Sequence, residues 1–95
     1  MINKVLTKGD RRGVFYDLFD EAEAAELVMR AQLVNALQAW MDSQAMSQSE
    51  IGKVLGIDQP RVSGLRNGNV ARFSLDKLVQ MAQRAGLKPQ LRIAS

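Results

Sequence analysis

The chain has 95 residues, of which 46% are hydrophobic and 24% charged, and a formal net charge of +3, as in a single soluble globular domain. It contains no cysteine and no histidine, which excludes disulfides and thiolate chemistry and removes the commonest metal ligand and general base. Because it has no familiar catalytic motif, no apolar run long enough to span a membrane and no signal-peptide-like start, we expect a cytoplasmic protein that is not an enzyme and holds no metal or cofactor.

The first 19 residues are expected to form a flexible arm that precedes one domain of residues 20–95. Residues 1–13 are polar, with glycine at two positions, whereas residues 14–19 hold three of the five aromatic residues. Two interpretations of residues 14–19 remain open: a segment that folds back over the core, or a contact surface for a partner protein. The candidate partner-binding residues are Phe15, Tyr16, Leu18 and Phe19.

Residues 20–43 are predicted to form one helix of about six turns. Asp20 and Glu23 have the spacing of a capping box. Apolar residues such as Val34, Leu37 and Met41 recur at intervals of three and four, and neither proline nor glycine interrupts the segment. This helix is expected to supply much of the core.

Two short helices are predicted between residues 47 and 68. Ser47 and Glu50 form a second capping box, which opens a helix that ends at Gly56. Asp58 caps the next helix, and Pro60 falls in its first turn, where a missing N–H is tolerated. Asn67 and Gly68 end this helix after Arg66.

A fourth helix is predicted from Ser74 to Gly86, with Leu75, Leu78, Val79, Met81 and Ala82 facing the core. Residues 87–93 then alternate apolar and polar side chains, which predicts a short edge strand. No other stretch is a convincing strand, so we expect the tails of two protomers to pair across a dimer axis. The candidate dimer residues are Leu87, Gln90, Leu91 and Ile93. The predicted fold is an all-α bundle of four to five helices with this short C-terminal strand.

The segment 47–68 is the candidate DNA-binding unit. Its apolar spacing lets the first short helix brace the second, so that Gln59, Arg61, Ser63 and Arg66 are left on an exposed face. An α-helix fits a major groove, where glutamine and arginine make paired contacts with base edges. Residues 51–95 also carry eight basic and two acidic side chains, against five and eight in residues 1–50. This asymmetry favours a polyanionic partner for the second half.

The motif SQSEIGKVLGIDQPRVSGLRNG at residues 47–68 resembles, without a gap, the helix-turn-helix of Cro and the phage repressors. Together with GVFYDL at 13–18, the 22–40 helix and ARFSLDKL, it makes residues 13–93 similar to HigA-like antitoxins, a subfamily of these proteins. The resemblance implies a helix-turn-helix bundle and a transcriptional regulator. It also implies a partner, a RelE-like or HigB-like toxin ribonuclease.

The resemblance further implies roles for individual residues on double-stranded DNA. Gln48 would bind a phosphate and brace Gln59, which would read a base such as adenine, while Arg61 and Ser63 would face the groove floor or its edge. The full set of candidate DNA-binding residues is Ser47, Gln48, Gln59, Pro60, Arg61, Ser63, Gly64, Arg66, Asn67 and Arg72.

Asn67 and Arg72 would hold phosphates of the flanking backbone. Two positions depart from the pattern. Gly64 stands where these proteins often carry a longer side chain that reads a base, so that readout would be lost or shifted to Arg61. Pro60 removes one amide from the helix N-terminus. Both departures concern which DNA sequence would be read, and not DNA binding itself.

The expected function is that of a homodimeric, sequence-specific regulator that binds a palindromic operator. The subfamily resemblance adds neutralisation of a toxin and autoregulation of the operon. A stand-alone phage-type repressor, without a toxin partner, is the alternative.

Overall fold

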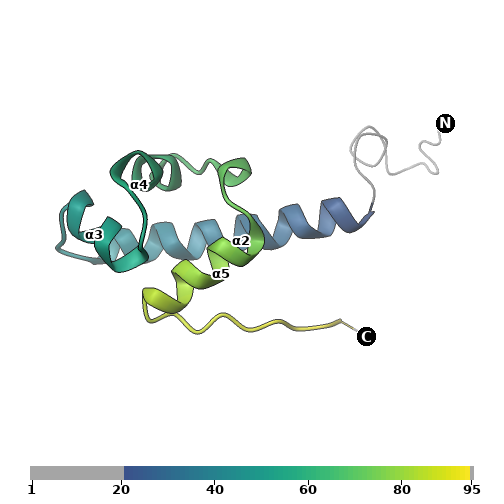
Figure 1. Cartoon of the computed structure of the whole chain (residues 1–95). Coiled ribbons are helices and arrows are strands. Elements are labelled where there is room, and N and C mark those ends of the chain that lie inside the picture. The colour runs from purple at the N-terminus through teal and green to yellow at the C-terminus, as the bar shows by residue number, and fades with distance from the viewer. Residues whose placement is uncertain (1–20, 95) are drawn as a thin grey trace.

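The computed structural model describes residues 21–94 of the chain. These residues form four α-helices and one 3₁₀ helix: α2 (Glu21–Ser43), α3 (Gln48–Leu55), α4 (Gln59–Arg66), η2 (Val70–Arg72) and α5 (Leu75–Arg84). Figure 1 shows α4 above the long helix α2 and α3 at the C-terminal end of α2, with α5 crossing α2 and the C-terminal segment running back beneath it. The described part of the chain is thus all-α, as predicted.

Helix α2 packs against α4, η2 and α5, whereas α3 packs against α4 and α5. Its C-terminal half carries Val34, Leu37 and Met41, each at most 1% exposed. These side chains join one apolar cluster with residues of α3, α4 and α5 and with Phe73. The N-terminal half extends beyond the other helices (Figure 1), and Val28 there is 53% exposed. The predicted single helix is confirmed, and its predicted cap, Asp20, lies outside the described residues.

The turn from α3 to α4 follows from local sequence. The Ser47 hydroxyl accepts from the Glu50 N–H at 3.1 Å, and the Glu50 carboxylate accepts from the Ser47 N–H at 2.9 Å, so the predicted capping box is confirmed. Gly56 ends α3 with φ 75°, a conformation that costs little only for glycine. Gly52 allows the chain to close tightly on α3, since a Cβ there would lie 2.7 Å from the Ile57 carbonyl oxygen.

Helix α5 closes the core from the other side. Ser74 caps it by accepting from the Lys77 N–H, and Leu78, Met81 and Ala82 are buried against α2 and α3. The prediction that Val79 faces the core is wrong, because its side chain is 38% exposed. Val79 lines an open groove between α2, α5 and the C-terminal segment instead.

The predicted strand at residues 87–93 is absent from the described structure, where these residues have no regular secondary structure. An extended segment needs a neighbouring strand to pair its N–H and C=O groups, and the helices of one protomer offer none. Leu87 is half-buried against the core cluster.

Within residues 21–94 we find no helix whose length and apolar character would let it cross a membrane.

Candidate nucleic-acid interface

The outward face of α4 is defined by what the helix buries. Val62 and Leu65 are fully buried, and residues three or four apart share a helix face. The opposite face therefore carries Pro60, Ser63 and Gly64, whose side chains are small or absent. The centre of the face is therefore low, in the sense that it carries only short side chains, so the helix backbone can approach a partner closely.

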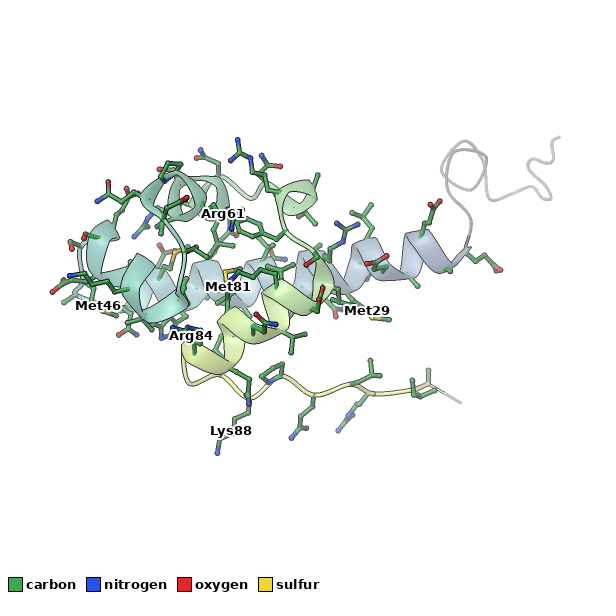
Figure 2. The ribbon with its side chains drawn as sticks, in the orientation of Figure 1. Met29, Met46, Arg61, Met81, Arg84 and Lys88 are labelled. Atoms are coloured by element: carbon green, nitrogen blue, oxygen red, sulfur yellow. The ribbon has the colours of Figure 1, made fainter. Side chains whose placement is uncertain are left out.

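Longer polar side chains border this low face. Gln59 and Arg61 are both exposed, and neither side chain makes a hydrogen bond or ion pair with another described residue. Figure 2 shows Arg61 on α4. Ser63 and Gly64 are half-buried, so the exposed face is formed mainly by Gln59, Pro60 and Arg61.

Both ends of α4 are fixed by side chains. At the N-terminus, the Asp58 carboxylate accepts from the Arg61 N–H at 3.0 Å. At the C-terminus, the Gln38 amide of α2 donates to the carbonyl oxygens of Leu65 at 3.0 Å and Arg66 at 3.2 Å. A helix leaves four N–H and four C=O groups without intrahelical partners, and these contacts satisfy some of them. The candidate face is therefore held rigidly on the rest of the domain.

Three of the nine basic side chains of residues 21–94 lie on α4 and η2. Arg61, Arg66 and Arg72 are exposed there. One of them, Arg66, has a partner: its guanidinium lies 3.6 Å from the Asp42 carboxylate of α2. Asp42 is 77% exposed in its side chain, so this pair is open to solvent and to competition from other anions.

Two other basic residues, Arg84 and Arg30, make contacts within the fold. The Arg84 guanidinium donates to the Val54 carbonyl at 3.0 Å, where it caps the C-terminus of α3. Arg30, on α2, donates to the Phe73 carbonyl at 3.3 Å and is half-buried. Lys88 lies at the edge of the molecule remote from α4 (Figure 2). Exposed basic side chains also lie away from α4, at Lys53, Lys88 and Arg92.

The first-helix candidates lie at the N-terminus of α3. Ser47 is occupied by the capping box. Gln48 is the first residue of α3 and half-buried. In the described structure no hydrogen bond joins Gln48 to Gln59, so the expected bracing between these two side chains is not formed in the free protein.

The segment after α4 adds candidates. Asn67 and Arg72 are exposed, and their contacts with a flanking backbone stay a prediction. Asn69 is also exposed and makes no side-chain cap for η2, although the sequence analysis did not select it. Its place directly after Asn67 and Gly68, in a run of turn-forming residues, was the available signal.

The remaining candidates lie elsewhere. The partner-binding residues Phe15, Tyr16, Leu18 and Phe19 fall outside the described residues. Of the dimer candidates, Gln90, Leu91 and Ile93 are exposed, on the C-terminal segment. No group of acidic side chains in residues 21–94 is arranged to hold a metal ion.

Comparison with known families matches residues 14–94 to the model described as "Helix-turn-helix domain". A search of curated proteins found no match to the chain. The family match spans most of the sequence and includes both short helices and the turn between them. The chain therefore belongs to the family of helix-turn-helix domains.

Proposed function

We propose that the protein is a sequence-specific regulator that binds double-stranded DNA by placing α4 in the major groove. The observation that carries this proposal is the outward face of α4: low at its centre, bordered by Gln59 and Arg61, and fixed at both ends. A major groove about 12 Å wide accepts one α-helix. A low centre brings the helix close to the base edges.

The proposed contacts divide into two kinds. Gln59 and Arg61 read bases, because their amide and guanidinium groups are unpaired and border the face that enters the groove. Arg66 and Asn67 approach the sugar-phosphate backbone from the C-terminal end of α4. Ser47 and Gln48, at the N-terminus of α3, lie at a helix end that suits a phosphate. Base contacts specify the sequence and phosphate contacts fix the register.

A gel-shift titration against the protein's own promoter DNA, at low and moderate salt, tests the proposal. We expect saturable binding that survives excess competitor DNA and weakens steeply as salt rises, because phosphate contacts release counterions. The double variant Gln59→Ala/Arg61→Ala should lose the specific complex. Lys88→Ala, on the opposite side of the molecule, should keep it. Binding that competitor DNA abolishes would contradict sequence-specific recognition.

We further propose that the protein acts as a homodimer on a palindromic operator, since one recognition helix offers few base contacts. Half-sites about 34–36 Å apart would then each receive one α4. Leu91 and Ile93 are 71% and 79% exposed, which supports the C-terminal segment as the contact between protomers. Light scattering should give a dimer for the wild type and a monomer for Leu91→Ser/Ile93→Ser.

A narrower role rests on the resemblance of residues 13–93 to HigA-like antitoxins. In this role the protein would neutralise a RelE-like or HigB-like toxin through Phe15, Tyr16, Leu18 and Phe19 and would repress its own operon. Co-purification with the product of a neighbouring toxin gene tests it. Operator binding without such a complex would favour a stand-alone repressor.

A further inference from the structure

Gly64 is an unusual residue for the middle of a recognition helix. It lies on α4, one turn after Pro60, and is half-buried. Its φ is not positive, so its backbone conformation does not require glycine, and glycine destabilises a helix interior by about 1 kcal/mol relative to alanine. What glycine provides here is space.

The space beside Gly64 is used by one side chain. A Cβ on Gly64 would lie 3.7 Å from Cδ of Arg72, and no other non-neighbouring atom of the described structure comes within 4 Å of it. The aliphatic part of Arg72 thus lies next to the bare backbone of α4. Arg72 occupies the side of the helix where a residue at position 64 would project.

The backbone that carries Arg72 is well anchored. Its N–H donates to the Asn69 carbonyl at 3.2 Å, and the next residue, Phe73, donates to Val70 at 3.3 Å. The Phe73 side chain is 3% exposed, and its carbonyl accepts from Arg30. Arg72 itself is exposed and makes no side-chain hydrogen bond or ion pair with any described residue. Its guanidinium is therefore free for a ligand while its base is fixed.

We propose that Arg72 reads a base pair of the operator, in place of the side chain that Gly64 lacks, and that the base is guanine. This inference rests on the proposed DNA binding. Arginine pairs in a bidentate manner with O6 and N7 of guanine. The stem of Arg72 lies against α4 at Gly64, so its guanidinium is carried beside the helix proposed to enter the groove.

The test compares Arg72→Ala and Arg72→Lys with the wild-type full chain on the operator and on a set of single base-pair substitutions. We expect the wild type to lose about 5- to 150-fold in affinity when the guanine of one half-site is replaced. Both variants should bind the original and the substituted operator nearly equally. Lysine keeps the charge but not the planar fork, so Arg72→Lys should retain the wild-type salt slope. Lys88→Ala should match the wild type throughout.

A uniform loss of affinity across all substituted operators in Arg72→Ala, with a salt slope reduced by about one and full recovery in Arg72→Lys, would identify a phosphate contact and overturn the inference. The proposed function would survive that result. Failure of the wild type to prefer its operator over competitor DNA would instead overturn the proposed function, and the inference with it. Circular dichroism of each variant verifies that the overall helix content is unchanged.

Discussion

The side-chain amide of Gln38 on α2 donates to the main-chain carbonyl of Leu65, in the last turn of α4, at 3.0 Å. The same amide nitrogen lies 3.2 Å from the Arg66 carbonyl. Helix α4 is therefore not supported by α3 alone. A second connection, from the long helix, fixes its C-terminal end, next to the residues proposed to contact DNA.

We expect Gln38→Met to lower the free energy of unfolding by about 1–2 kcal/mol. Methionine has a similar length and flexibility but no donor, so the carbonyls of Leu65 and Arg66 lose a partner that contributes about 0.5–1.5 kcal/mol per hydrogen bond. Urea denaturation measures the change. Gln80→Met is the matched control, since Gln80 is exposed on α5 and its side chain bonds to no described residue. Equal stabilities for the two variants would show that the Gln38 contacts contribute nothing.

Two glycines should respond in opposite ways to alanine. In Gly52→Ala the new Cβ would lie 2.7 Å from the Ile57 carbonyl oxygen, a backbone atom, so we expect a loss of about 1–3 kcal/mol from overpacking. In Gly64→Ala the Cβ makes only an ordinary contact with Arg72, so the better helix propensity should stabilise by about 0.5–1 kcal/mol. Thermal unfolding of both variants decides this. Destabilisation by Gly64→Ala would mean that its surroundings are tighter than the geometry indicates.

Local features of the fold could be predicted from sequence because the residues that make them are neighbours. The capping box of Ser47 and Glu50, the cap at Asp58 and the left-handed turn at Gly56 each depend on residues within four positions. Val79 was misplaced because α5 carries more apolar residues than one face can bury, and only the position of α2 decides which are covered. The predicted strand at residues 87–93 is not formed, because the alternation of apolar and polar residues does not itself provide a strand to pair with.

The candidate site was predictable only in part, because some of its contacts join residues that are far apart in the sequence. Exposure of Gln59 and Arg61 follows from the burial of Val62 and Leu65 on the same helix. The Gln38 contacts join residues 27 and 28 positions apart, and nothing in the sequence distinguishes this glutamine from others on α2. The contact between Gly64 and Arg72 depends on the path of the chain through η2, which short-range spacing does not specify.

Asp42 should weaken DNA binding by competing for Arg66, whose guanidinium lies 3.6 Å away. In Asp42→Asn we expect about two- to fivefold tighter operator binding at low salt, since exposed ion pairs are worth up to about 1 kcal/mol. The gain should shrink as salt screens the charges. Glu26→Gln makes the same change in net charge from an exposed position in the N-terminal half of α2. If both variants bind equally tightly, the effect belongs to net charge and not to the Arg66 pair.

The stability of α5 should depend on pH through Asp76, which lies in its first turn. A hydrogen bond with the Ser74 side chain, followed by backbone N–H groups, lowers the pKa of Asp76 below its ordinary value of 3.8. Because the folded pKa is the lower one, this carboxylate stabilises the protein above the unfolded value of 3.8, and the contribution disappears as the pH falls through the folded pKa. We therefore expect Asp76→Asn to have a lower Tm than the wild type at neutral pH and the two melting curves to converge in acid. A difference in Tm that stays constant across this range would show that the ionised carboxylate is not its source.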